Sequence, residues 1–377
     1  MTEMMILGTR KGLLQFEDHG GEWRFCRESF KAQPVSHAMR DPRTGILWAA
    51  IDHGHWGCKL HKSADNGATW TEIPAPVYPA DAAINTAFPG EEAKLKPATL
   101  SYIWLIAPGG ADQPQRLYLG TEPGGLFQSD DGGETFTFVD ALWNRPERTY
   151  WWFGGGRDHP GLCSLCVDPR DSRHVVIGIS VGGVYETRDD GASWQPLNKG
   201  LYANYLPDPH SEFGHDPHYL LMSPANPDVL WMQNHCGVFH STDSGQLWHD
   251  VSQEGGPVYF GFPIAADETD PDTAWVIPAI DAEFRTAIGQ ALCVCRTQDG
   301  GKTWTALRDG LPQALTYDVV LRHALDLKGD RLAFGTTTGN LYLSDDRGDS
   351  WRSLGSNLPP IYSGRFASVE GVGCACF

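Results

Sequence analysis

The chain has 377 residues, of which 41% are hydrophobic and 20% are charged, and its formal net charge is -18. This balance is typical of a globular chain, and the negative charge argues against nucleic acid or an anionic membrane as the main partner. The N-terminal MTEMMILGTRKGLLQFED has no long apolar core, and no window approaches 18 uninterrupted apolar residues. We therefore expect no signal peptide and no membrane span.

The nine cysteines favour a cytoplasmic protein with reduced thiols. Several form C-x-C pairs, and two residues at that spacing in a strand point to the same face and rarely bridge each other. A four-cysteine zinc site is the alternative, but only one C-x2-C pair is present, Cys163 with Cys166. We expect the thiols to act mostly as small buried hydrophobes.

An octet with the pattern S/T-x-D-x-G-x-T/S-W recurs along the chain. Its Asp can accept backbone N–H bonds across a tight turn, its Gly permits positive φ, and its terminal aromatic can pack on a neighbouring sheet. Two copies depart slightly, with Phe136 at the Trp position and Leu247 at the Thr/Ser position. The copies in chain order are FEDHGGEW (16–23, degenerate), SADNGATW (63–70), SDDGGETF (129–136), TRDDGASW (187–194), STDSGQLW (241–248), TQDGGKTW (297–304) and SDDRGDSW (344–351).

Each octet follows a strand, a Gly-rich turn and a second strand, as in VVIGISVGGVYE, and one more strand comes earlier. Four strands at this repeat length form a β-propeller blade. The N-terminal MMILGTRKGLLQFEDHGGEWRF would supply three strands of a further, shared blade, and the C-terminal GRFASVEGV its innermost strand. We predict an all-β, seven-bladed β-propeller, one domain over 1–377, with six complete blades at roughly 34–73, 98–139, 161–197, 216–251, 259–307 and 316–354.

The octets resemble the Asp-box (BNR) repeat of sialidases, sortilin-type receptors, some glycoside hydrolases and photosystem assembly factors. The stretches LGTRKGLL, WFGGGRDHPGLCSLCVDP, DPHYL, YDVVLRHALD and RLAFGTTTG resemble a bacterial Asp-box group commonly labelled glycosyl hydrolase or exo-alpha-sialidase. The resemblance covers most of the chain and implies the propeller fold. The Arg-Ile-Pro signature of sialidases is missing, and sialidases have six blades, so sialidase activity itself is not expected.

The topology places the octet turns on one face of the propeller. The other turns and the loops between blades then lie on the opposite face, here called the upper face, where the innermost strands open onto the central channel. Three of these loops are long, and long loops in a compact domain are usually functional. Nine of the 14 histidines fall on or beside this face: His37, His53, His55, His159, His210, His215, His218, His235 and His323.

Histidines on the upper face suggest a metal site. HDPH places two histidines at the start of one innermost strand, and His235 ends the adjacent strand. Imidazoles that converge from separate elements suit a divalent metal, here Zn, Mn or Fe. The candidate ligands are His215, His218, His235, His53 and His55. Two alternatives remain: neutral histidines that hydrogen-bond loop carbonyls, and His218 and His235 as a catalytic acid and base without metal.

Other upper-face residues suit catalysis and substrate binding. Asp281 and Glu122 are candidate proton donors or acceptors, although glycoside hydrolysis needs two suitably spaced carboxylates. Arginine forks bind carboxylates well, and aromatic rings can stack on sugars. The candidate substrate-binding residues are Arg10, Arg157, Arg365, Trp152, Tyr259 and His323. Solvated carboxylates, loop-bracing arginines and core-capping rings are the corresponding structural alternatives.

Together these features favour a hydrolase- or lyase-type enzyme, with or without the assistance of a metal. Its substrate would be a small polar molecule, carbohydrate-like or carboxylated, bound at the upper end of the channel. A non-catalytic binding or assembly-factor propeller is the alternative, because a fold does not by itself fix a function. A broad exposed patch would favour that alternative, whereas the long loops and grouped histidines favour a recessed site.

Overall fold

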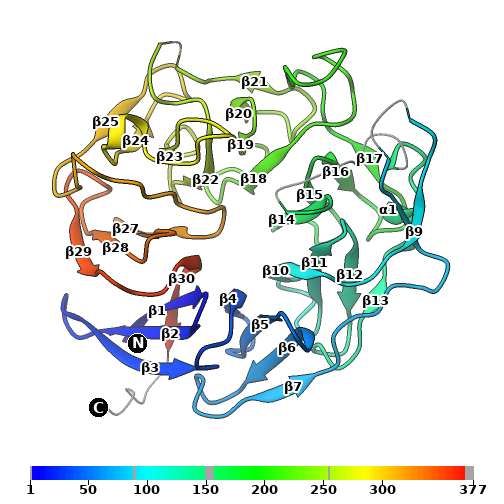
Figure 1. The fold of residues 1–377 in the computed structure, drawn as a ribbon, viewed down its shortest axis with the longest axis horizontal. Coiled ribbons are helices and arrows are strands. Elements are labelled where there is room, and N and C mark those ends of the chain that lie inside the picture. The colour runs from blue at the N-terminus through cyan, green and yellow to red at the C-terminus, as the bar shows by residue number, and fades with distance from the viewer. Residues whose placement is uncertain (1, 88–90, 149–156, 254, 370–377) are drawn as a thin grey trace.

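The computed structural model describes residues 2–87, 91–148, 157–253 and 255–369, and these form a ring of antiparallel sheets around a common centre (Figure 1). Seven sheets of four strands are present in these ranges. Six of them follow chain order from the innermost strand outward: β4 (Val35–Arg40), β5 (Leu47–His53), β6 (Gly57–Ser63) and β7 (Thr71–Ile73); β10 (Tyr102–Pro108), β11 (Leu117–Glu122), β12 (Leu126–Ser129) and β13 (Thr137–Phe138); β14 (Gly161–Val167), β15 (Val175–Ser180), β16 (Gly183–Thr187) and β17 (Gln195–Pro196); β18 (Pro217–Met222), β19 (Leu230–Asn234), β20 (Gly237–Ser241) and β21 (His249–Asp250); β22 (Gly261–Ala266), β23 (Ala274–Pro278), β24 (Val294–Thr297) and β25 (Thr305–Leu307); β26 (Leu325–Lys328), β27 (Arg331–Gly335), β28 (Leu341–Ser344) and β29 (Arg352–Gly355). The predicted seven-bladed β-propeller is confirmed.

Little structure lies outside the blades. A two-stranded ribbon, β8 (Ala83–Asn85) with β9 (Leu95–Pro97), decorates the loop before β10. A short helix α1 (Asp140–Trp143) and a 3-10 turn η1 (Ile288–Gln290) complete the regular elements. Across the described ranges no helix has the length and apolar character needed to cross a bilayer. The seven cysteines inside those ranges are free thiols, and Cys374 and Cys376 lie outside them.

The seventh blade is shared by the two ends of the chain, as predicted. Its strand order is β3 (Trp23–Ser29), β2 (Gly12–Asp18), β1 (Thr2–Thr9) and β30 (Ile361–Val369). β1 and β30 pair antiparallel from Thr2 opposite Val369 to Thr9 opposite Ile361. In Figure 1 the red β30 lies beside the blue β1 at the channel. The innermost edge of the N-terminal strands is therefore fully paired.

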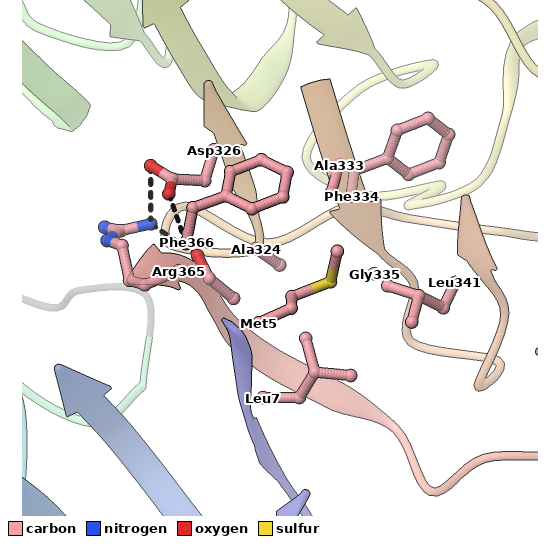
Figure 2. A pocket seen from close by; sticks show the side chains of 11 residues that line it. Met5, Leu7, Ala324, Asp326, Ala333, Phe334, Gly335, Leu341, Arg365 and Phe366 are labelled. Atoms are coloured by element: carbon pink, nitrogen blue, oxygen red, sulfur yellow. Dashed lines mark hydrogen bonds and ion pairs between the residues drawn. The ribbon is translucent and has the colours of Figure 1, made fainter. Parts of the chain in front are cut away.

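The hydrophobic core lies between neighbouring blades. Figure 2 shows one such contact, where Met5 and Leu7 of β1 face Phe334 and Leu341 of the preceding blade. At its polar margin the Asp326 carboxylate accepts the backbone N–H of Phe366 at 2.7 Å. Each blade buries a face that it could not bury alone, so the ring is stabilised as a whole.

The last complete blade begins later than predicted. We expected it to start near 316, whereas β26 begins at Leu325. Residues 316–324 form a loop whose Arg322 and His323 are 6% and 4% exposed. The His323 carbonyl accepts the N–H of Gly364, and the backbone of His323 forms an isolated parallel β-bridge with Ser363 of the shared blade. Contacts with the neighbouring shared blade, which no local pattern reports, replace regular pairing here.

The octet turns share one hydrogen-bond pattern, which the copy at 129–136 illustrates. The Asp131 carboxylate accepts the backbone N–H of Thr135 at 3.0 Å and the hydroxyls of Ser129 and Thr135 at 2.8 and 2.6 Å. In STDSGQLW, Leu247 keeps the backbone bond to Asp243 at 3.0 Å but has no hydroxyl to donate. The complete pattern recurs at Asp65, Asp189, Asp299 and Asp346.

The residue at the aromatic position of two octets hydrogen-bonds through its backbone to the preceding blade. The backbone N–H of Trp248 donates to the Lys199 carbonyl at 2.9 Å, and that of Trp351 donates to Asp309 at 3.0 Å. Gly310 follows Asp309 at φ +77°, and a Cβ there would lie 1.8 Å from the Trp351 carbonyl oxygen. The two backbones approach so closely that only glycine fits.

We expect the octet aspartates to stabilise the fold less as the pH falls into the acid range. Hydrogen bonds led by Thr69 and Thr135 lower the pKa of Asp65 and of Asp131 to about 2. Because an unfolded aspartate has a pKa near 3.9, their contribution is complete above about pH 4 and is lost as the pH falls towards about 2. Urea unfolding measured across this range should show the free energy of unfolding falling with pH. Asp131→Asn should make that fall shallower, and an unchanged pH dependence would contradict the assignment.

Candidate functional site

A cavity of about 180 Å³ opens at the upper end of the channel. Its aromatic wall comes from the first residues of three innermost strands, with Tyr102 and Trp104 on β10, Phe262 on β22 and Tyr362 on β30. Its cationic residues come from loops: Arg157, Arg285 and Arg322. The expectation that the starts of innermost strands open onto the channel holds for these positions. Stacking rings and guanidinium groups suit a polar ligand that carries an anionic group.

Glu122 lies directly behind this wall, at the end of β11, and is 1% exposed. One carboxylate oxygen accepts the Trp104 indole N–H at 3.1 Å, and the other accepts the N–H groups of Asp158 and His159 at 3.2 and 3.3 Å. Burial raises the pKa of Glu122 above its ordinary value, against the opposing effect of these bonds and of Arg157. A carboxyl group in such an environment can hold a proton for transfer.

Arg157 connects Glu122 to a second carboxylate, Asp52, at the upper end of β5. Its guanidinium lies 3.8 Å from Glu122 and 3.5 Å from Asp52. The same group stacks over Tyr102 at 4.1 Å from the ring centroid. Two carboxylates that do not themselves line the cavity therefore flank Arg157, which lines it together with Tyr102.

Arg322 is the most deeply buried cation of the cavity, with 6% of its surface exposed. It lies over Trp104 and Phe262, at 4.8 and 5.2 Å from the ring centroids. Its NH2 group donates to the Ser180 hydroxyl at 3.4 Å, while its Nε has no hydrogen-bond partner within the described part of the chain. A buried guanidinium with unused donors is a candidate anion-binding group.

A second cluster of polar side chains joins β18 to β19. Asp216 lies 3.5 Å from the Nε2 of His218 and 3.3 Å from the Nδ1 of His235. The His218 ring stacks on Phe262 at 4.7 Å, so this cluster and the cavity share one aromatic residue. Although burial opposes it, His218 and the other partners hold the pKa of Asp216 well below its usual range. The carboxylate is therefore ionised.

The structure brings together two of the five predicted metal ligands, His218 and His235. His215 points elsewhere, with its Nε2 2.6 Å from the Ser211 carbonyl. His53 closes its own turn, where its Nδ1 accepts the N–H of Trp56 at 3.1 Å, and His55 is exposed beside the Trp56 ring. Within the described ranges the only group suited to a metal is Asp216 with His218 and His235. The other three candidate ligands lie elsewhere: hydrogen bonds within turns hold His215 and His53, and His55 packs beside Trp56.

Asp281, the remaining predicted catalytic residue, hydrogen-bonds to the backbone of its own loop. Its carboxylate accepts the N–H groups of Glu283 and Phe284 at 2.9 and 2.6 Å, which stabilises an exposed loop. Asp281 does not line the cavity, in contrast to Arg285 of the same loop. An Asx-type turn therefore accounts for this aspartate.

The predicted substrate-binding residues divide between the cavity and other places. Arg157 and His323 line the cavity, while Arg10 is exposed outside its lining. Arg365 donates to the backbone carbonyls of His323 and Gly364, both at 2.9 Å, and so braces the channel wall. Tyr259 is 42% exposed and lies outside the cavity lining. Trp152 lies outside the described residues.

His323 is a buried channel residue. Its Nε2 lies 2.7 Å from the Cys163 carbonyl, and its ring meets those of His37 and Tyr219 at 5.0 and 5.1 Å. Burial, followed by the charge of Arg365, lowers the pKa of His323 to about 3. The ring is therefore neutral at physiological pH, and its Nε2–H donates to the carbonyl.

The prediction from sequence missed the aromatic wall and Asp52. Tyr102, Trp104 and Phe262 belong to strands that also supply core residues, so composition alone does not separate them from the core. Their shared place at the starts of innermost strands was the available signal. Asp52 lies in the stretch DHGH next to His53, and the two histidines of that stretch, not Asp52, were predicted to be functional.

Comparison with curated proteins gives distant relatives, and no family model matches the chain. The oligoxyloglucan-reducing end-specific xyloglucanase of Emericella nidulans is 24% identical over 309 residues, which cover 81% of this chain and 32% of that protein. A xyloglucanase of a Paenibacillus species is 24% identical over 226 residues, covering 52% of this chain and 20% of that protein. The chain thus spans about a third or less of the curated relatives it matches.

Solved structures share the fold. An ancestral GH74 enzyme superposes with a TM-score of 0.58 at 15% identity, over 85% of this chain and 38% of that one. YCF48 from Cyanidioschyzon merolae gives a TM-score of 0.52 at 16% identity, over 87% of each chain. At these identities the likeness concerns architecture alone. The chain has the β-propeller fold of solved GH74 structures.

Proposed function

We propose that the chain is a carbohydrate-acting hydrolase whose substrate binds in the upper cavity. The observation that carries this proposal is the contact of buried Glu122 with Trp104 and Arg157, both of which line the cavity. The similarity to two xyloglucanases supports the substrate class. The resemblance of the octets to the Asp-box repeat is compatible with it, since that repeat also occurs in glycoside hydrolases.

The two carboxylates at Arg157 suit glycosidic bond cleavage. Glu122, with its raised pKa, donates its proton to the oxygen of the leaving sugar as the bond to the anomeric carbon breaks. Asp52, which is partly exposed, either deprotonates the water that attacks this carbon or first bonds to the carbon itself, and water then cleaves that bond and releases the sugar. Arg157 lies between them, 3.5 Å from Asp52 and 3.8 Å from Glu122, and orients both carboxylates. The aromatic wall holds the sugar rings by stacking.

The cavity cations favour a substrate with an acidic group. Arg322 is buried with an unpartnered Nε, and Arg157 and Arg285 line the same space. A bound carboxylate would accept the unused donors and neutralise buried positive charge. We infer that a uronate-containing oligosaccharide fits better than a neutral one.

The test is hydrolysis by the purified full chain of two matched panels, neutral xyloglucan oligosaccharides and uronate-containing oligosaccharides. New reducing ends are counted, and binding is measured in parallel by calorimetry. We expect turnover on a member of these panels, with preference for the acidic one. Binding without turnover on every member would overturn the hydrolase proposal and favour the non-catalytic binding propeller instead.

Arg322→Met tests the anionic preference. Methionine preserves most of the packing against Trp104 and Phe262 but removes the charge. We expect the acidic substrate to lose about 10- to 100-fold in kcat/KM, while the neutral one changes little, because charged hydrogen bonds contribute about 1.5–3 kcal/mol. Arg10→Met, on an exposed arginine outside the cavity lining, is the matched control. An equal loss on both substrates would mean that Arg322 has only a structural role.

A further inference from the structure

The backbone pairing of β18 with β19 brings three ligand groups to one place. Pro217 is opposite Asn234, and the His235 N–H donates to the Asp216 carbonyl at 3.0 Å. This register places the side chains of Asp216 and His218 next to that of His235. One oxygen or nitrogen from each of Asp216, His218 and His235 lies within 4.8 Å of the others.

The remaining atoms of two of these side chains are held by other partners. The Nδ1 of His218 lies 2.5 Å from the Gly261 carbonyl, which can only accept, so Nδ1 carries the hydrogen and Nε2 keeps a lone pair. The Oδ1 of Asp216 accepts the Ser180 hydroxyl at 2.7 Å and the Val181 N–H at 3.1 Å. The Oδ2 of Asp216 and the Nε2 of His218 are therefore the atoms left to face His235.

The spacing suits an ion better than direct hydrogen bonds. The Asp216 oxygen lies 3.3 and 3.5 Å from the two histidine nitrogens. Charge-assisted N–H···O bonds are shorter, about 2.7–2.9 Å. Ligand atoms that share one metal at about 2.0–2.2 Å are about 3 Å or more apart. A carbonyl that orients a ligating histidine, as Gly261 orients His218, is the usual outer contact of a metal site.

We propose that Asp216 Oδ2, His218 Nε2 and His235 Nδ1 bind one divalent transition metal. Two imidazoles and one carboxylate suit Zn²⁺, Fe²⁺ or Mn²⁺ and leave positions for water or a ligand. The His218 side chain is 3% exposed and that of His235 30%, so the open positions face the His235 side. Phe262, on which His218 stacks, also lines the cavity, so one aromatic ring connects the proposed ion site to the cavity wall.

The proposal does not rest on the hydrolase assignment, because metal binding is measured directly. The full chain is stripped with chelator and titrated with Co²⁺, whose visible d–d absorption distinguishes a four- or five-coordinate protein site from the hydrated ion. Zn²⁺, Mn²⁺ and Fe²⁺ are then added as competitors, and elemental analysis gives the stoichiometry. The variants are His235→Ala and Asp216→Asn, with His215→Ala and His53→Ala as matched controls taken from the same face.

We expect one Co²⁺ per chain for the wild type and both controls. His235→Ala should bind at least about 10-fold more weakly and lose the d–d bands, since even outer contacts of metal sites contribute 10- to 100-fold. The thermal midpoint without metal checks folding, and His235→Gln serves if the alanine variant is unstable. Undiminished binding by the His235 variants, loss of binding in His53→Ala, or no Co²⁺ bands in the wild type would each overturn the proposal.

Discussion

Glutamine in place of Glu122 is expected to lower kcat by about 10²- to 10⁴-fold on the oligosaccharide that the wild type cleaves, with little change in KM. Such a loss is typical when a general acid is removed. Glutamine matches glutamate in shape, and its oxygen can still accept the Trp104 indole N–H. The fold should therefore survive, and steady-state kinetics beside thermal unfolding separates the two effects.

The pH profile and the leaving group identify the role of Glu122 more sharply. Because its pKa is raised and the protonated form acts, kcat/KM should fall as the pH rises through that pKa, and this limb should vanish in Glu122→Gln. An aryl glycoside, whose leaving group needs little protonation, should lose less activity than the oligosaccharide. Glu283→Gln, the same change at an exposed upper-face residue, is the control. Equal losses on both substrates would argue against an acid at this position.

Gly310→Ala is expected to produce a large loss of stability, about 2–5 kcal/mol. The new Cβ would meet the Trp351 carbonyl oxygen at 1.8 Å, so one backbone must move. Overpacking costs about 1–3 kcal/mol, and a non-glycine residue at positive φ adds about 1–2 kcal/mol. The movement would also strain the bond from the Trp351 N–H to Asp309. Urea unfolding followed by tryptophan fluorescence measures the change.

Gly329→Ala separates the two contributions. Gly329 also has positive φ, +58°, but a Cβ there meets nothing within 4 Å. It should cost only the conformational part, about 1–2 kcal/mol. Equal losses in the two variants would mean that backbone strain alone, and not the contact between blades, makes Gly310 necessary.

The blade architecture could be predicted because residues close together in the sequence form each octet turn. The octet at 129–136 contains its own aspartate, hydroxyls and glycine, and these residues bond to one another within a single turn. Each copy marks one turn between two strands, so the repeat fixes strand order and the shared seventh blade. The start of the last complete blade was wrong because the contacts of His323 with Gly364 and Ser363 cross between blades.

The site could be predicted only in part, because it depends on distances between blades. Asp216, His218 and His235 come from one blade, where strand register already brings them close. His53 comes from a different blade, and its distance from these residues depends on how the propeller closes, which no local sequence pattern reports. The aromatic wall combines Trp104, Phe262 and Tyr362 from three blades, whose inward direction follows only from the closed ring.

The pairing of β1 with β30 also determines when the shared blade can be completed during synthesis. During translation β1, β2 and β3 are made before the other six blades, yet β30, the partner for the inner edge of β1, is made only after them. Until then the nascent hairpins carry an unsatisfied row of backbone donors and acceptors next to apolar Met5 and Leu7. Such an edge invites pairing with neighbouring chains on a polysome. The pairing that closes the ring therefore leaves this apolar edge exposed until β30 has been made.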